Sequence, residues 1–231
     1  MLKLLQNFIA PDICPICEEE LAHPQLKVCV NCFEQLPKLP EQRCPACGGP
    51  ADQLFDNCRN CLKNPPYPWE RAVSAFPFEG TARTALHQLK FRDGTKLVNF
   101  FAKHMADAWN AYAEDFNPTA VTAVPLHWKR RLKRGYNQSY ELARTMANIL
   151  GLPCLKLLRK TIATKPQATL NARNRRKNLS RAFKARRKAQ GHRIILVDDI
   201  FTTGSTLSAA AKALLKQKAQ AIAVATAARD L

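Results

Sequence analysis

Eight of the nine cysteines stand in four CxxC pairs near the start of the chain, and this pattern constrains the fold of that segment more than any other feature. The pairs are Cys14/Cys17, Cys29/Cys32, Cys44/Cys47 and Cys58/Cys61. Eleven residues separate the first two pairs and ten separate the last two, so the pattern is an internal repeat with a period near 30. Two CxxC turns together supply the four thiolates of the tetrahedral site that Zn²⁺ prefers. We therefore expect two zinc ions in this segment.

The spacing leaves open how the four CxxC turns pair. The repeat favours two sequential sites, the first from the first two pairs and the second from the last two; a crossed, RING-like pairing is the alternative. Disulfides would need an oxidising compartment, which nothing in the sequence indicates. Sites of four cysteines are coordinatively closed, so we expect structural zinc that stabilises a segment poor in large apolar side chains. A docking surface for DNA or protein is the alternative role of these ribbons. The ninth cysteine, Cys154, is expected to be buried.

Positive charge is concentrated in one later segment. The net charge is +18, and 20 of the 36 lysines and arginines lie between Trp128 and Arg193, where Glu141 is the only acid. Solvated basic loops usually contain interleaved acids, so this segment predicts a partner with phosphate groups: nucleic acid, a phosphorylated metabolite or both. No stretch reaches the roughly 18–20 apolar residues of a transmembrane helix, and no secretory signal is present, so we expect a cytoplasmic protein without a membrane span.

The hydrophobic periodicity divides the chain into two regions. Residues 1–63 hold a short N-terminal helix over 1–9 and the double zinc ribbon, and the proline-rich stretch Asn64–Pro68 predicts a boundary. Residues 64–231 alternate strands with helices, which predicts an α/β fold with a mostly parallel sheet. The expected strands cover 71–78, 121–125, 154–158, 193–197 and 221–227, and the expected helices cover 81–89, 97–112, 137–150 and 207–218. Asn137 is the expected N-cap of the third helix and Gly151 its stop.

One strand end carries the most informative motif of the sequence. The apolar run 193–197 is followed by Asp198 and Asp199, and then by a loop of hydroxyl residues and glycine that opens a helix. Backbone N–H groups at a helix N-terminus bind phosphate, and open α/β sheets place their ligands at the carboxyl ends of strands. Two adjacent carboxylates at that place suit the two vicinal hydroxyls of a ribose. The segment therefore predicts a site for a ribose 5-phosphate group.

These residues resemble the PRPP-binding signature of type I phosphoribosyltransferases, where PRPP is 5-phosphoribosyl-1-pyrophosphate. The resemblance implies a type I phosphoribosyltransferase-like parallel sheet with helices on both faces. It implies that Asp198 and Asp199 hold the ribose hydroxyls and that Mg²⁺ accompanies PRPP. The residues implied to surround the 5′-phosphate are Thr202, Thr203, Gly204, Ser205 and Thr206.

A second resemblance covers nearly the whole chain. Cysteine turns followed by a PRPP-type domain are similar to the ComF family of competence proteins, also called GntX. Supporting motifs are Leu89–Gly94, Val124–Leu126, Arg134–Gln138 and the run from Arg159 to Phe183, although Tyr136 stands where the family usually has Phe. The resemblance implies a role in natural transformation, in which the protein handles incoming single-stranded DNA and works with a helicase-like partner. The alternative is a catalytically active phosphoribosyltransferase with an unidentified acceptor.

The basic residues are given roles on this basis. Residues 160–190 resemble the mobile hood that closes over PRPP in related enzymes. The candidates for pyrophosphate are Lys90, Arg92, Arg130 and Arg134, and the last two join Asp198 and Asp199 as catalytic candidates. The candidates for contacts with DNA are Lys165, Arg173, Arg175, Arg176, Lys177, Arg181, Arg186 and Arg187. Four aromatic residues in the basic segment are candidates for stacking on bases: Trp128, Tyr136, Tyr140 and Phe183. Of these, Tyr140 lies on the helix expected over 137–150, and we expect it to belong to the core.

Overall fold

The computed structural model describes residues 13–23, 27–51, 58, 61–62, 66–89, 95–126, 136–161 and 182–231. Its elements in chain order are α2 (Val30–Glu34), β1 (Arg71–Pro77), α4 (Gly80–Gln88), α5 (Thr95–Tyr112), η2 (Glu114–Phe116), β2 (Ala120–Ala123), α7 (Gln138–Ile149), β3 (Leu158–Lys160), β4 (Phe183–Ala185), η4 (Arg187–Ala189), β5 (Arg193–Phe201), α9 (Ser205–Lys216) and β6 (Ala221–Arg229). Within these ranges, no helix combines the length and the hydropathy that crossing a membrane requires. The helix expected over 1–9 lies outside the described residues.

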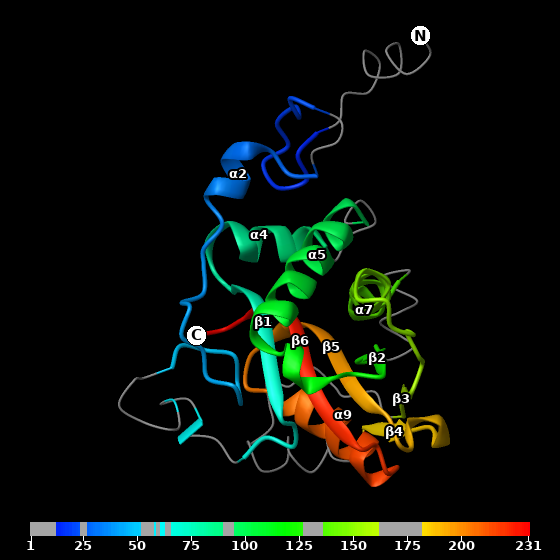
Figure 1. Ribbon diagram of the computed structural model, residues 1–231. Helices are drawn as coiled ribbons and strands as arrows, with labels where there is room; N and C mark the ends of the chain where they lie inside the picture. Colours follow the sequence, from blue (N-terminus) through cyan, green and yellow to red (C-terminus); the bar gives the residue numbers. More distant parts are fainter. Residues whose placement is uncertain are drawn as a thin grey trace, which may run out of the picture.

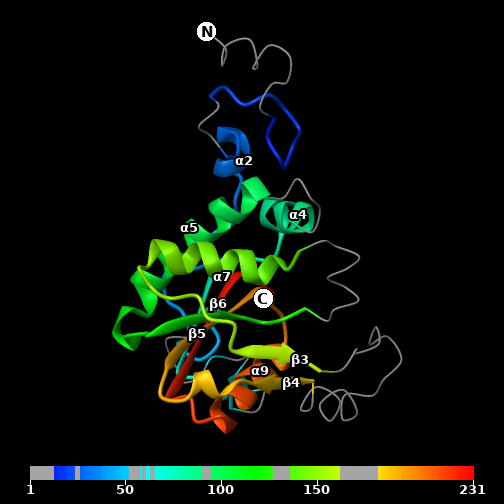
Figure 2. The ribbon, with the colours of Figure 1, turned by 90° about the vertical axis from the view of Figure 1, so that its right-hand side faces the viewer.

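Four parallel strands in the order β1-β6-β5-β2 form the central sheet. Helices α5 and α7 contact each other and cover one face, while α9 packs on the other (Figures 1 and 2). All nine residues of β6 are buried, because a parallel sheet with helices on both faces leaves its central strands no exposed side. The expected α/β fold, with a parallel sheet and helices on both faces, is confirmed.

The strand expected over 154–158 is wrong. Cys154, which is only partly buried, makes an isolated bridge with Val121, and the strand that follows, β3, begins at Leu158 and pairs antiparallel with β4 in a separate two-stranded sheet. The side chain of Thr122 explains the early end of the pairing with β2. Its Oγ1 donates to the carbonyl of Leu155 and accepts from the N–H of Leu157, so it takes the place of a backbone partner.

Helix α7 has the expected residues at both ends, but its N-terminus lacks the expected side-chain cap. Asn137 occupies the N-cap position, but its side chain makes no capping hydrogen bond and instead donates to the carbonyl of Val124, 3.2 Å away. At the other end, Gly151 has a φ of 67°, the left-handed conformation that commonly ends a helix. The N–H of Leu152 then donates to the carbonyl of Ala147, as in a standard helix C-cap.

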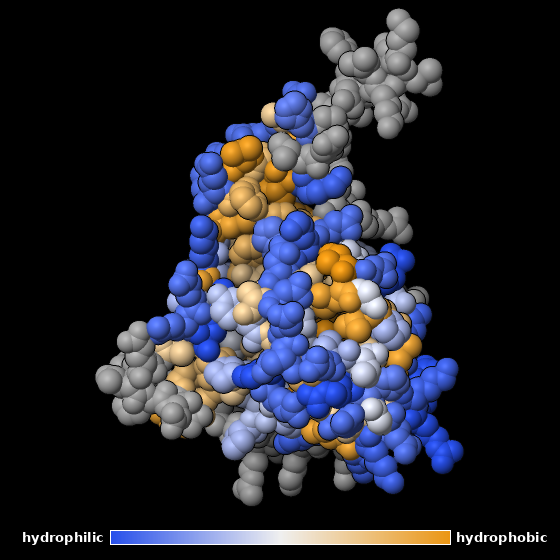
Figure 3. Space-filling model, in the orientation of Figure 1, coloured by the Kyte–Doolittle hydropathy of each residue, from blue (hydrophilic) through white to orange (hydrophobic). Residues whose placement is uncertain are grey.

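The two cysteine modules pack on different parts of the α/β domain. In the first, Phe33 of α2 packs edge-on against Phe100 and His104 of α5. Beside them, Val30 and Phe33 stay about half exposed, and apolar surface is visible around α2 in Figure 3. In the second module, Cys44, Cys47 and Cys58 share a buried cluster with residues of β5, α9 and β6. These contacts cross the boundary expected at residues 63 and 64, and the division into two domains stays a prediction.

The second module also covers the free edge of β1. The N–H of Ala72 donates to the carbonyl of Pro45 at 2.8 Å, and Arg43 donates to the carbonyl of Ser74 at 3.1 Å. The guanidinium carbon of Arg43 lies 4.0 Å from the ring centroid of Tyr112 at the end of α5. An uncovered edge strand is a template for aggregation, so this module satisfies the backbone of β1 and protects the sheet.

A hydrogen bond inside the sheet gives a test of this packing. The hydroxyls of Ser74 in β1 and Thr226 in β6 lie 2.7 Å apart and are buried. Thr226→Val should lower the free energy of unfolding by about 1–3 kcal/mol, because it leaves the Ser74 hydroxyl buried without a partner. The double variant Ser74→Ala/Thr226→Val should recover part of that loss in urea denaturation. Equal losses in the single and double variants would contradict this explanation.

Candidate functional site

The carboxyl end of β5 departs from regular strand geometry at the two aspartates. Val197 packs into the cluster under α5 and α7, and Ile200, three residues later, packs against the same cluster, so the alternation of faces is interrupted between them. Each aspartate accepts from the next backbone amide: Asp198 Oδ1 from the N–H of Asp199 at 3.0 Å, and Asp199 Oδ1 from the N–H of Ile200 at 2.9 Å. Both bonds lie beyond the point where the pairing with β2 ends, at Ala123, whereas β5 stays paired with β6 through Phe201.

Asp198 lies against the first turn of α7. Its Oδ1 accepts from the hydroxyl of Ser139 at 2.8 Å. Burial raises the pKa of Asp198 well above its usual range and the neighbouring Asp199 raises it further, while the Ser139 hydrogen bond opposes the shift. Ser139 belongs to the run Tyr136-Asn137-Gln138-Ser139 at the start of α7, and we did not expect its contact with the acids. An acid held near a helix N-terminus at a strand end can accept hydrogen bonds from a sugar or bind a cation.

The loop from Thr202 to Thr206 forms the start of α9. Gly204 is the N-cap residue, with a φ of 70°, and as a glycine it has no side chain to cap the helix. The hydroxyl oxygens of Thr203 and Ser205 lie 2.9 Å apart. The backbone N–H of Ser205 donates a hydrogen bond to Thr203 Oγ1, with 3.4 Å between nitrogen and oxygen. Thr202 and Thr203 are exposed. A twelve-residue helix whose N-terminus lies next to these exposed hydroxyls is suited to bind an anion.

Three aromatic side chains fix the turn at Gly204. A Cβ at this position would lie 2.9 Å from Tyr67, 3.1 Å from Phe201 and 3.3 Å from Trp69. The rings of Tyr67 and Trp69 stack with centroids 4.6 Å apart, and Phe201 meets both edge-on. Burial raises the pKa of Tyr67 to about 12. These aromatic residues were not among the predicted site residues. The sequence motif does not indicate that its glycine adopts a positive φ, and only the structure shows which side chains surround that glycine.

The eight paired cysteines form two groups of four, as the sequential interpretation predicts. Cys14, Cys17, Cys29 and Cys32 make one group, and Cys44, Cys47, Cys58 and Cys61 the other, with all sulfur atoms of a group within 4.8 Å of one another. Sulfur pairs lie 3.6 Å apart in the first group and 3.4 and 3.7 Å apart in the second. Tetrahedral Zn–S bonds of about 2.3 Å would place the sulfurs about 3.8 Å apart, so the cages fit zinc.

Backbone amides favour the thiolate of one cysteine in each cage, Cys14 and Cys44, whereas burial raises the pKa of Cys32 and Cys61. Burial raises the pKa of Cys44, but N–H groups of Cys47 and Ala46 outweigh it and lower that pKa to about 7. In the first group, Cys29 Sγ accepts from the N–H of Cys32 and caps α2. Metal binding needs thiolates, so these amides lower the cost of deprotonating Cys14 and Cys44.

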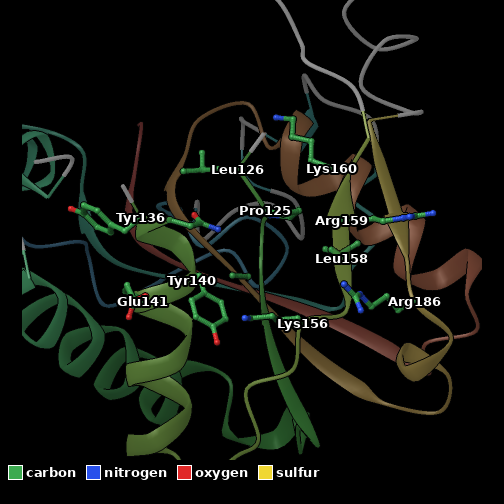
Figure 4. A pocket seen from close by; sticks show the side chains of 12 residues that line it. Pro125, Leu126, Tyr136, Tyr140, Glu141, Lys156, Leu158, Arg159, Lys160 and Arg186 are labelled. Carbon is green, nitrogen blue, oxygen red and sulfur yellow. The ribbon is translucent and has the colours of Figure 1, made fainter. Parts of the chain in front are cut away.

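A second polar feature lies beside the carboxyl end of β2. A pocket of about 400 Å³ opens between the first turn of α7 and the sheet of β3 and β4. Figure 4 shows Tyr140 and Lys156 side by side in it, with Arg159 and Arg186 on the β3–β4 side. Its lining residues are Ala123, Pro125, Leu126, Tyr136, Asn137, Tyr140, Glu141, Lys156, Leu158, Arg159, Lys160 and Arg186. Four cations around one acid make the pocket attractive to phosphate groups.

The aromatic candidates for stacking on bases differ in their access to this pocket. Tyr136 and Tyr140 line it. Phe183 in β4 is 4% exposed, so its ring is not accessible to a base. The fourth candidate, Trp128, lies outside the described residues.

The structure describes only part of the predicted site. It places the two aspartates and the 202–206 loop at one strand-to-helix junction, and it places Arg186 in the pocket and Arg187 exposed in η4. The other basic candidates lie outside the described residues: Lys90, Arg92, Arg130, Arg134, Lys165, Arg173, Arg175, Arg176, Lys177 and Arg181. So does most of the expected hood.

Two glycines with the same backbone conformation allow the cost of backbone strain to be measured separately from the cost of steric crowding. Gly151 has a φ of 67° and open space where a methyl group would lie, whereas Gly204 has aromatic rings in contact distance. Gly151→Ala should cost about 1 kcal/mol of stability from the left-handed backbone alone. Gly204→Ala should cost clearly more, about 2–4 kcal/mol, because the rings must also move. Equal losses in thermal or urea unfolding would show that the rings do not constrain the loop.

The raised pKa of Asp198 predicts that replacing this acid with neutral asparagine stabilises the protein, by an amount that depends on pH. The pKa of Asp198 is higher in the folded protein than in the unfolded chain. Its contribution to stability is therefore fully present below the unfolded pKa and is lost as pH rises through the folded pKa. Asp198→Asn should therefore unfold at a higher temperature than the parent protein near about pH 7, with the difference shrinking towards about pH 3. A difference that is constant with pH, or that reverses sign, would contradict the burial of this acid.

Comparisons with known proteins agree with this geometry. Residues 137–231 match the phosphoribosyl transferase domain family. The chain is 32% identical to the DNA utilization protein YhgH of Salmonella typhi, over 93% of this chain and 95% of that protein. It is 30% identical to Competence protein F of Haemophilus influenzae, over 91% of this chain and 94% of that protein.

Among solved structures, the glutamine PRPP amidotransferase of B. subtilis overlaps 57% of this chain and 27% of its own, with 20% identity and a TM-score of 0.40. Full-length similarity to YhgH and Competence protein F, a phosphoribosyl transferase domain and two cages of four cysteines occur here in one polypeptide. The chain belongs to the ComF family of competence proteins.

Proposed function

We propose that this protein handles single-stranded DNA in natural transformation and binds PRPP with Mg²⁺ at the junction of β5 and α9. The relatives named for DNA utilization and for competence support the role, and the two sites at the carboxyl edge of the sheet support the chemistry. We place the protein in the cytoplasm, together with a helicase-like partner, as the ComF resemblance implies.

The sugar-phosphate part of the proposal is supported by the junction itself. The exposed hydroxyls of Thr202 and Thr203 and the amides at the start of α9 would take the 5′-phosphate, and the adjacent acids would take the ribose hydroxyls. Carboxylate oxygens are also ligands of the kind that Mg²⁺ prefers. The acids and the loop are separated by only two residues, so one ligand can reach both.

The basic pocket is the observation that carries the DNA part. Within the described residues, no carboxylate pairs with Arg159 or Arg186, and the acid in the pocket, Glu141, forms its ion pair with Arg144 at 3.0 Å. Lys156 lies 4.9 Å from the ring centroid of Tyr140, so a cation and an aromatic ring line the same wall. Cationic grooves with aromatic side chains are typical of sites for single-stranded nucleic acid.

The two cysteine cages would hold structural zinc ions. Four thiolates leave no coordination position for a reacting water, so zinc contributes folding energy and no catalysis in this proposal. Cys14, Cys44 and Cys47 are almost completely buried, which suits a structural site better than an exchangeable one.

A transferase reaction is the second candidate, and the acid pair favours it. Carboxylates beside the ribose would stabilise positive charge that develops at its C1 when pyrophosphate leaves. Release of pyrophosphate from PRPP in the presence of candidate bases, amines or DNA would establish turnover. Absence of release in all of them, with PRPP still bound, would leave a binding site.

Two double variants test the two ligands separately. Asp198→Ala/Asp199→Ala should reduce PRPP affinity, measured by calorimetry with Mg²⁺, by more than about tenfold and leave DNA affinity within about twofold. Arg159→Ala/Arg186→Ala should do the reverse, lowering the affinity for single-stranded oligonucleotides by about tenfold at low salt. Fluorescence anisotropy over a salt series should show a smaller salt dependence for the arginine variant, because it makes fewer phosphate contacts.

The matched control removes two exposed lysines of α9. Lys212→Ala/Lys216→Ala lowers the net charge equally but lies away from the pocket. Its DNA affinity should change by less than about twofold. An equal loss in the lysine and arginine variants would show that overall charge, and not the pocket, binds DNA. No measurable DNA binding by the parent protein at low salt would refute the DNA role.

A further inference from the structure

We propose that the second cysteine cage holds the phosphate loop in its binding shape, and that the buried Arg229 is the positioning residue that joins them. This inference rests on the proposed function, because it treats the 202–206 loop as a phosphate site. It gives the second cage a task that the first cage does not share.

Arg229, the last residue of β6, is among the largest fully buried side chains of the protein. Its exposed fraction is 2%, and its Nη1 donates a hydrogen bond to the carbonyl of Cys47, a member of the second cage. The guanidinium also lies against the turn that follows Cys47, since a Cβ on Gly49 would come within 2.9 Å of its Nε and Cζ. The contact leaves no room for a side chain at Gly49.

The charge of Arg229 needs a counterpart. In the part of the chain that the structure describes, it forms no ion pair with a carboxylate, and its Nε has no hydrogen-bond partner. A buried charge without a counterion is strongly destabilising. Four thiolates around one Zn²⁺ carry a net charge of −2, so the loaded second cage supplies the missing negative charge.

Two routes lead from this cage to the phosphate loop. On the first, the guanidinium carbon of Arg229 lies 4.9 Å from the ring centroid of Phe201, and Phe201 is one of the rings that fix Gly204. On the second, Trp69 Nε1 donates to the carbonyl of Ala46, inside the Cys44–Cys47 turn, at 2.7 Å. The ring of Trp69 then stacks on Tyr67, which also touches the Gly204 position. Loss of the cage would free both ends of this aromatic cluster.

The first cage has no comparable connection within the described residues. Its buried residues, Cys14 and Cys32, belong to the cluster on the α5 side of the sheet, and Phe33 of the same module contacts α5. The aromatic cluster, Arg229 and the second cage lie on the α9 side, although strands β5 and β6 contribute side chains to both faces. The two cages should therefore differ in their effect on the loop, although both would bind the same metal.

The test compares Arg229→Met with Arg43→Met by amide hydrogen exchange. Arg43 is an internal control, because it also joins the second module to the sheet, through the carbonyl of Ser74, but does not contact the loop. Arg229→Met should speed exchange in residues 202–206 by at least about tenfold, leave α7 unchanged and weaken binding of ribose 5-phosphate by at least about tenfold. Arg229→Lys, which restores the charge, should recover part of both losses. Arg43→Met should change neither.

Cysteine variants test the metal cage itself. Cys61→Ser should speed exchange in the loop as Arg229→Met does, whereas Cys17→Ser should not, with bound zinc counted by mass spectrometry in each. Should Arg229→Met fail to fold, Trp69→Phe keeps an aromatic side chain at this position but removes the hydrogen bond to the carbonyl of Ala46, and it should speed loop exchange by a smaller factor.

The two possible failures are distinguishable. If the parent protein does not bind ribose 5-phosphate, the proposed ligand is wrong, yet the exchange measurements still decide whether Arg229 and the second cage hold the loop. If loop exchange is unchanged in folded Arg229→Met, or changes equally in Cys17→Ser and Cys61→Ser, the inference is overturned even when the ligand binds.

Discussion

The turn from β5 into α9 at Gly204 is the constraint on which the site depends. The chain must reverse direction at a φ of 70° while three aromatic rings leave no space for a Cβ. This turn joins the end of β5, which carries the two acids, to the first residues of α9. Without it, the hydroxyl residues would form an ordinary loop and the helix would begin elsewhere.

The same strand end balances opposing electrostatic demands. Burial and the neighbouring Asp199 disfavour ionisation of Asp198, and the Ser139 hydroxyl and the N–H of Asp199 offset only part of that cost. A cation bound beside these acids would stabilise their ionised form. In the proposed function, Mg²⁺ bound with PRPP would supply that positive charge. The cations of the neighbouring pocket lie near β3 and β4, and neither aspartate lines that pocket.

Much of this could be predicted from the sequence, because the relevant signals are local. The CxxC repeat predicts two sequential cages, and the apolar strand, paired acids and hydroxyl loop predict the junction of β5 and α9. The alternation of strands and helices likewise predicts the parallel sheet, apart from the strand over 154–158, where the Thr122 side chain takes the place of a partner strand. The prediction of Asn137 as N-cap identified the position but not the bond that its side chain makes.

The rest could not be predicted, because it depends on contacts between distant parts of the chain. Cys47 and Arg229 are 182 residues apart, and an arginine in a small-residue strand gives no sign that it is buried against a cysteine turn. Likewise, Tyr67 lies in the proline-rich stretch that is typical of a linker, and Trp69 follows directly after it. Both nevertheless pack against Gly204. Ser139 was missed because helix periodicity says nothing about which strand end its first turn meets.

The most direct measurement of the central claim is a crystal structure of the protein with PRPP and Mg²⁺. We expect the 5′-phosphate on the amides and hydroxyls between Thr202 and Thr206, with the ribose hydroxyls beside Asp198 and Asp199. Density for the ligand only in the basic pocket, or an empty loop at saturating concentration, would contradict this claim.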